Sequence, residues 1–135
     1  MPGNEDRVGY WLTPPDLMAE LQAEFDFNFD SAPYPRPAGF DGLKEPWGKR
    51  TWCNPPFNRA ERGSTGYTAW ARKALAERDM GKTVVCIFPI RVWLHLFLEA
   101  GAEIRLLGPV EWEKPDGSKI HHAQNQALFI LRPKP

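Results

Sequence analysis

The stretch Thr83-Val84-Val85-Cys86-Ile87-Phe88-Pro89-Ile90 decides the fold that we expect for this chain. It is a continuous apolar run bounded by turn signals, and its β-branched residues favour a strand at the centre of a sheet, covered on both faces. Helical patterns lie on either side of it, at residues 67–75 and 92–100, and they end near Gly81 and Gly101. The centre of the sequence therefore predicts helix, buried strand and helix in succession.

The rest of the chain continues this alternation. Thr13 as a cap, followed by prolines in the first turn, predicts a helix to about Glu24. Further strands are expected at residues 25–30, 50–53, 103–107, 110–112 and 126–131, the last two around a turn at 115–118. The resulting fold class is α/β, a single domain over residues 1–135 whose mostly parallel sheet has an antiparallel C-terminal edge.

Composition narrows the class of protein. With 42% hydrophobic and 13% aromatic residues in 135, the chain can bury a core, which argues against wholesale disorder. No apolar run approaches ~18 residues and no signal peptide is visible, so we expect a soluble cytoplasmic protein without membrane contact. Cys53 and Cys86 are expected to be buried thiols. We expect no metal site, because His121 and His122 are adjacent and would point to opposite faces of a strand.

Charge is balanced overall but unevenly distributed. Residues 1–30 carry seven acids against one base, whereas residues 44–91 carry ten bases against four acids. This polarity predicts that one face meets phosphates, as in a DNA-binding protein. The alternative is that many of these charges form ion pairs along helix surfaces.

The stretch Arg50-Thr51-Trp52-Cys53-Asn54-Pro55-Pro56-Phe57 carries the clearest chemical signal. A polar residue, two prolines and an aromatic directly after an apolar strand are typical of amino-group methyltransferases. The lone pair of an exocyclic amine is delocalised into its ring. Hydrogen bonds from that amine to the Asn54 side-chain oxygen and the Pro55 carbonyl would re-aim the lone pair at a methyl donor. The prolines would keep the loop rigid, and Phe57 would stack on a base taken out of the helix. The structural alternative is a proline-stiffened turn beside a core aromatic.

Three further blocks, in this order, give the chain a family resemblance over roughly Tyr10 to Leu131. They are Tyr10-Trp11-Leu12-Thr13-Pro14-Pro15-Asp16-Leu17, Phe27-Asn28-Phe29-Asp30-Ser31-Ala32, and Phe40-Asp41-Gly42-Leu43 with Trp47. With the Asn-Pro-Pro-Phe motif they resemble the phage-type DNA adenine-N6 methyltransferase family. The resemblance implies a Rossmann-like fold, S-adenosylmethionine as cofactor, DNA as partner, and the host cytoplasm as location if a phage encodes the protein.

The resemblance also implies site residues. Thr13 and Pro14 belong to a loop that reaches the methionine part of the cofactor, Asp30 and Ser31 end the first strand, and Asp41 corresponds to an acid that meets the cofactor's adenine. The full set of candidates is catalytic Asn54, Pro55, Pro56 and Phe57; cofactor-binding Trp11, Thr13, Pro14, Asp30, Ser31, Asp41 and Asn54; and DNA-binding Phe57, Arg59 and Arg62.

Each of the less certain candidates has a structural alternative. Asp30 competes with a role as a cap or turn residue, and Asp41 with an Asp-Gly turn. Trp11 could equally pack in the core, and Arg59 and Arg62 could be solvated loop charges.

One departure separates the chain from most S-adenosylmethionine enzymes. No glycine-rich loop follows Asp30, and only ten residues separate it from Asp41, too few for a helix and two strands. The sheet is therefore expected to be trimmed. Two other functions stay open: amine methylation of RNA or of protein glutamine, and a degenerate methyltransferase fold that only binds. The expected oligomeric state is a monomer or a weak dimer.

Overall fold

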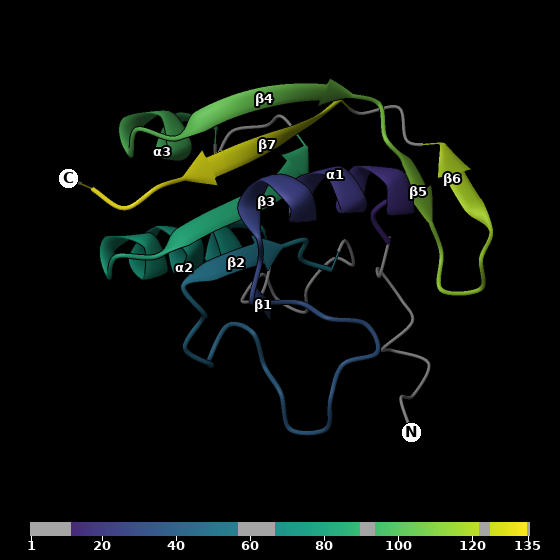
Figure 1. Ribbon diagram of the computed structural model, residues 1–135, viewed down its shortest axis with the longest axis horizontal. Coiled ribbons are helices and arrows are strands. Elements are labelled where there is room, and N and C mark those ends of the chain that lie inside the picture. Colours follow the sequence, from purple (N-terminus) through teal and green to yellow (C-terminus); the bar gives the residue numbers. More distant parts are fainter. Residues whose placement is uncertain (1–11, 57–66, 90–93, 122–124, 135) are drawn as a thin grey trace.

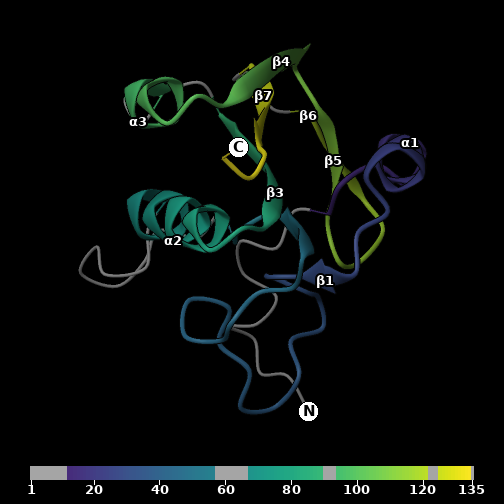
Figure 2. The same cartoon turned by 60° about the vertical axis from the view of Figure 1, so that its left-hand side comes forward.

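The computed structural model describes residues 12–56, 67–89, 94–121 and 125–134. In chain order the elements are α1 (Pro15–Phe25), β1 (Phe29–Asp30), β2 (Arg50–Cys53), α2 (Tyr67–Asp79), β3 (Thr83–Pro89), α3 (Leu94–Glu99), β4 (Glu103–Gly108), β5 (Glu111–Glu113), β6 (Lys119–His121) and β7 (Gln126–Leu131). Figures 1 and 2 show a sheet as the middle layer, with α1 on one face and α2 and α3 on the other. The expected α/β class is confirmed. No helix in the described ranges is long and apolar enough to cross a membrane.

The sheet has the strand order β1-β2-β3-β7-β4. Strands β1, β2 and β3 pair in parallel, and β7 is antiparallel to both β3 and β4. The central position expected for residues 83–90 is confirmed over residues 83–89, because β3 lies third in this order with six of its seven residues buried, and Ile90 lies outside the described residues.

The prediction of an antiparallel C-terminal edge is wrong. Strand β7 lies between β3 and β4, and β4 forms the edge. The physical reason is burial: all six residues of β7 are buried, whereas two residues of β4 are exposed. A strand that is apolar on both faces needs cover on both faces, and an interior position in the sheet provides it.

The expected pairing of residues 110–112 with 126–131 is also wrong. Strand β5 pairs instead with β6, which the sequence analysis missed, and Trp112 lies opposite Ile120 in a separate two-stranded sheet. The turn at 115–118 closes this hairpin, where the backbone of Lys114 bonds that of Ser118. The expected turn is confirmed. Strand β6 has only three residues, two of them polar, so it lacks the run of alternating apolar residues that predicts a strand.

The strand expected at residues 25–30 is reduced to two residues. Phe25 is the last residue of α1, and Asp26 closes the helix in a left-handed conformation with φ 53°. Its backbone N–H donates to the Gln22 carbonyl, as in a common helix C-terminal motif. Phe25 therefore packs from the helix and leaves only Phe29 and Asp30 to pair with β2.

Two apolar clusters fill the space on either side of the sheet. One joins the sheet to α2 and α3 and includes Trp70, Phe88, Phe97 and Phe129. The other joins it to α1 and β5 and includes Leu21, Phe25, Trp52 and Trp112. The expectation that Cys53 and Cys86 are buried thiols is confirmed. Burial, and then a hydrogen bond with Cys53, raises the pKa of the Cys86 thiol well above its ordinary value.

The irregular segment between β1 and β2 is held to α2 by Trp47. Its indole Nε1 donates to the Gly42 carbonyl at 2.7 Å, and its ring lies 6.4 Å from that of Trp70. Only glycine fits at position 42, because the Cβ of any other residue would lie 1.9 Å from the Ser31 carbonyl oxygen. These contacts fix the path of a proline-rich loop that lacks regular structure.

A buried carboxylate completes this anchor. Glu77 is 2% exposed, accepts from the Trp47 backbone N–H at 3.1 Å and from Lys73 Nζ at 2.7 Å, and also pairs with Lys82. Burial raises the pKa of this carboxyl, but the hydrogen bonds from Lys73, Lys82 and Trp47 outweigh it and hold the pKa below its ordinary value. Glu77 is thus an ionised junction between α2 and the loop.

We expect Glu77→Gln to lower the free energy of unfolding by roughly 2 kcal/mol at pH 7, because charge-assisted bonds to a buried group are lost. Since the folded-state pKa lies below 4.5, this stabilisation is present above pH 4.5 and disappears as the pH falls through the lowered pKa. Urea unfolding at pH 7 and pH 3 measures both effects. Glu24→Gln is the matched control, because the Glu24 side chain is 42% exposed and its ion pair with Arg105 should contribute far less. Equal losses in the two variants would contradict the burial argument.

Candidate functional site

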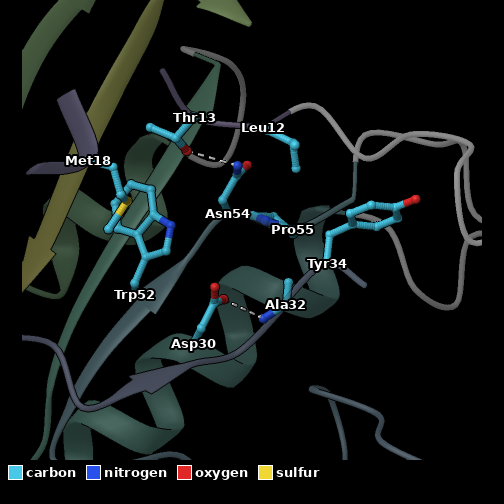
Figure 3. A pocket seen from close by; sticks show the side chains of 9 residues that line it. All are labelled: Leu12, Thr13, Met18, Asp30, Ala32, Tyr34, Trp52, Asn54 and Pro55. Atoms are coloured by element: carbon cyan, nitrogen blue, oxygen red, sulfur yellow. Dashed lines mark hydrogen bonds between the residues drawn. The ribbon is translucent and has the colours of Figure 1, made fainter. Parts of the chain in front are cut away.

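The neighbouring parallel strands β1 and β2 each have a polar residue at or directly after their carboxyl ends, which lie on the same side of the sheet. Asp30 ends β1 and lies opposite Trp52 in the register, and Asn54 follows β2 directly. Both line one cavity of about 220 Å³, as expected from parallel strands whose carboxyl ends meet at one edge (Figure 3). The described residues that line the cavity are Leu12, Thr13, Met18, Asp30, Ala32, Tyr34, Trp52, Asn54 and Pro55.

The Asn54-Pro55-Pro56 turn leaves the sheet at the cavity. Proline has no backbone N–H to continue a ladder, so β2 stops at Cys53. Pro55 is buried and lines the cavity, and Pro56 is half-buried. The Asn54 side-chain Nδ2 donates to Thr13 Oγ1 at 3.1 Å. Asn54 and Pro55 therefore lie at the cavity, with the Asn54 side chain anchored to Thr13.

The predicted threonine cap of α1 is wrong. The residue at the cap position is Pro14, no side chain bonds to the end of the helix, and Pro15 begins the first turn. Thr13 Oγ1 accepts from Asn54 instead. Pro14 contributes its carbonyl to the first turn, where it accepts from the Met18 N–H at 3.0 Å, and it is not among the lining residues.

The segment that carries Thr13 is held by the small hairpin. Leu12 donates its N–H to the Glu113 carbonyl at 2.6 Å, and Glu113 donates its own N–H to the Leu12 carbonyl at 3.0 Å. This antiparallel bridge attaches residue 12 to β5, and α1 begins three residues later. Thr13 is thus fixed from both sides.

Asp30 presents a carboxylate at the cavity wall. Its Oδ1 accepts from the Ala32 N–H at 3.0 Å. Part of the residue stays exposed to solvent, but the protein atoms around the carboxyl raise its pKa by desolvation, and the Ala32 bond offsets this only in part. Asp30 therefore makes the local turn that was its structural alternative, and it also lines the cavity, while its role toward a cofactor stays a prediction.

Two other cofactor candidates lie outside this group. Ser31 is fully buried, and its Oγ donates to the Trp52 carbonyl at 3.1 Å. Asp41 accepts from the Leu43 N–H at 2.9 Å with Oδ1, and its carbonyl accepts from Lys44 and Glu45, which is the turn considered as its alternative. Neither lines the cavity. Trp11, Phe57, Arg59 and Arg62 lie outside the described residues.

Part of the positive charge at 44–91 is used in ion pairs within the fold. Of the seven bases in this stretch that the structure describes, four form ion pairs: Arg50 with Asp26, Lys73 and Lys82 with Glu77, and Arg78 with Asp79. Lys44, Lys49 and Arg72 are exposed. The alternative of ion pairs along helix surfaces is met by Lys73 and Glu77, which are four residues apart on α2.

Five lining residues were not singled out as site residues: Leu12, Met18, Ala32, Tyr34 and Trp52. Trp52 belongs to the core, where it packs against Phe27 with ring centroids 5.6 Å apart, and it lines the cavity as well. Tyr34 and Ala32 follow Asp30 in the chain, so their proximity to a candidate residue was a usable signal. Leu12 adjoins Thr13 and carried the same signal.

No known protein family matches this sequence, and a search of curated proteins finds no significant relative. Within the described ranges, no cluster of three or more His, Cys, Asp or Glu side chains is arranged to hold a metal ion. The chemistry of the site therefore has to be argued from its own residues.

We expect Asp30→Asn to raise the melting temperature at pH 7, because the variant keeps an oxygen for the Ala32 N–H without a desolvated charge. The folded-state pKa lies above the ordinary 3.8, so the penalty is absent below pH 3.8 and grows as the pH rises through the raised pKa. The difference between variant and wild type should therefore vanish in acid. Asp41→Asn is the control for altering a turn oxygen away from the cavity. A lower melting temperature for Asp30→Asn at pH 7 would show that the carboxylate stabilises the fold.

Proposed function

We propose that this chain is an S-adenosylmethionine-dependent methyltransferase that methylates the N6 amine of adenine in DNA. The observation that carries the proposal is the position of Asn54 and Pro55. They follow β2 directly and line a cavity that Asp30 also lines, at the carboxyl edge of a parallel strand pair. The resemblance of the Asn-Pro-Pro-Phe motif to amino-group methyltransferases supports the same activity.

The chemistry asked of Asn54 and Pro55 is to activate a weak nucleophile. An amine conjugated to a purine can donate two hydrogen bonds through its N–H groups, and two fixed acceptors draw its nitrogen toward tetrahedral geometry. Asn54 would supply its side-chain oxygen and Pro55 its carbonyl. Because the prolines and the Thr13 bond already hold this turn, ordering it upon binding costs little.

The remaining lining residues fit the proposed cofactor. S-adenosylmethionine has charged and apolar parts, and when bound it would supply an electrophilic methyl group. Asp30 offers a carboxylate to its polar groups, while Trp52 and Tyr34 offer aromatic surface and Met18 offers an apolar side chain. A site with one carboxylate among aromatic and apolar side chains suits such an amphipathic ligand. Asp41 is not among the lining residues, so its role toward the cofactor's adenine stays a prediction from the sequence.

DNA is the acceptor that the resemblance favours, and exposed Lys44, Lys49 and Arg72 are available for phosphates. The deciding experiment incubates the protein with methyl-labelled S-adenosylmethionine and, separately, DNA, RNA or protein. Label in DNA that digestion recovers as N6-methyladenine supports the proposal. Label only in RNA or in protein glutamine would replace it with one of the alternatives, and no label in any acceptor would leave a binding module.

We expect S-adenosylmethionine to raise the melting temperature. A ligand that binds only the native state stabilises it by about 2.7 kcal/mol at 100 times its dissociation constant. Asp30→Asn should lose most of this shift because the carboxylate lines the cavity, whereas Glu24→Gln, at an exposed ion pair that is not among the lining residues, should keep it. Scanning fluorimetry across cofactor concentrations measures the shift. A melting temperature that stays flat up to millimolar cofactor would count against methyl transfer.

We expect Asn54→Ala to reduce turnover by ~10² to 10³, because it removes one acceptor for the amine in the transition state. Cofactor affinity should change little. Asn54→Asp is the matched control, since aspartate also presents a side-chain oxygen, and it should keep measurable activity. Steady-state methyl transfer with calorimetric cofactor binding separates the two effects. An alanine variant with near wild-type turnover would remove Asn54 from the reaction.

A further inference from the structure

The hairpin of β5 and β6 forms a small sheet of its own, outside the five-stranded sheet. Figures 1 and 2 show it beside the start of α1. Each of its strands has three residues. A two-stranded hairpin is at best marginally stable in water when it stands alone. The order of this hairpin therefore depends on its contacts with the rest of the protein.

Two kinds of contact attach the hairpin. Trp112 is fully buried in the apolar cluster on the α1 face of the sheet, together with Leu21 and Trp52. The backbone of Glu113 exchanges two hydrogen bonds with that of Leu12, of 2.6 and 3.0 Å, in an antiparallel bridge. Since the N–H and C=O of one strand residue point to the same side, Lys119 of β6 pairs with Glu113 from the other side. Strand β5 thus lies between Leu12 and β6.

The bridge continues directly into the cavity wall. Leu12 and Thr13 both line the cavity, and the Thr13 hydroxyl is hydrogen-bonded to the Asn54 side chain at 3.1 Å (Figure 3). None of the described residues that line the cavity belongs to the hairpin. One part of the cavity wall is therefore held in place by an element that lies outside the cavity.

The turn of the hairpin depends on a glycine. Gly117 has φ 91°, and its N–H donates to the Lys114 carbonyl at 2.8 Å. The Lys114 N–H donates in turn to the Ser118 carbonyl at 2.8 Å. Residues 116–119 are exposed, and a short exposed element of this kind opens locally at a lower free energy than the buried strands of a sheet. When the hairpin opens, Leu12 loses its backbone partner.

We propose that the β5–β6 hairpin is a clamp that positions the cavity wall: it opens and closes together with Leu12, and the cavity binds its ligand only when the hairpin is closed. This inference rests on the proposed function for the identity of the ligand, S-adenosylmethionine. Because closing and binding are linked, the cofactor stabilises the closed hairpin by as much as closing favours the cofactor. A substitution in the turn, outside the cavity, therefore weakens binding.

The variant that tests the clamp is Gly117→Val, and Gly81→Val is its matched control. Both glycines are exposed, have left-handed φ angles of 91° and 95°, and have open space where a side chain would begin. Each donates its N–H to the carbonyl three residues earlier. A β-branched residue is strained in this conformation. The two variants thus impose the same strain, one on the hairpin and the other on the turn between α2 and β3.

Amide hydrogen exchange measured by NMR reports on opening. The Lys114 N–H reports on the hairpin and the Leu12 N–H on the bridge. In Gly117→Val both should exchange at least about fivefold faster than in wild type, and by the same factor, because a left-handed residue is costly. In Gly81→Val both should stay within about twofold. Faster exchange of Lys114 without Leu12 would overturn the clamp. So would hairpin amides of Gly117→Val that exchange no faster than those of β3, since the hairpin would then open only with the whole protein.

The cofactor provides the second arm of the test. If the open hairpin cannot bind, S-adenosylmethionine at 100 times its dissociation constant should slow the local exchange of Lys114 and Leu12 in Gly117→Val about a hundredfold. By calorimetry, the dissociation constant of this variant should rise by the inverse of the fraction of molecules in which the hairpin is closed, while Gly81→Val binds like wild type. Unslowed exchange of Lys114 at saturating cofactor would overturn the clamp and leave methyl transfer intact.

Failure of the proposed function has a different signature. A wild type that does not bind S-adenosylmethionine would refute that function and the identity of the ligand. The exchange of Leu12 and Lys114 in the two valine variants needs no cofactor, and it would still decide whether the hairpin holds the cavity wall.

Discussion

The parallel pairing of β1 with β2 is the constraint on which the site depends. It sets Asp30 opposite Trp52 and brings the residues after both strands to the same edge of the sheet. Strand β3 secures this arrangement, since it pairs in parallel with β2 over four residues and is buried on both faces. A shift of one residue in this register would turn the cavity-lining side chains to the opposite face.

At the carboxyl ends of β1 and β2, two residues depart from the roles that their local sequence favours. Thr13 forgoes a helix cap to hold Asn54, and Asp30 keeps a carboxylate where desolvation raises its pKa. Departures from local preference of this kind are expected at functional sites. Glu77, away from the cavity, differs from these residues. Its buried carboxylate is paired with Lys73 and Lys82 and accepts from the Trp47 N–H.

The irregular segment between β1 and β2 shows how a shortened connection can still be rigid. It has neither helix nor strand, yet Trp47 ties it to α2 through Glu77 and to itself through the Gly42 carbonyl. The close approach of Gly42 to Ser31 then holds the residues that follow β1 against the sheet. Asp41 and Ser31 were expected beside the cofactor. Instead the Asp41 side chain accepts from the Leu43 N–H and the Ser31 hydroxyl donates to the Trp52 carbonyl, while Ala32 and Tyr34 line the cavity.

The sequence by itself determined the type of most described elements, though not β6, and the position of the motif, because apolar periodicity and proline chemistry act over a few residues. Residues 83–90 were recognisable as a central strand, and Asn54-Pro55-Pro56 as the point where β2 must stop. Only the tertiary structure decided that β7 lies inside the sheet, that β5 pairs with β6, and that Thr13 meets Asn54. These outcomes depend on competition between distant partners for burial and hydrogen bonds, which no local pattern records.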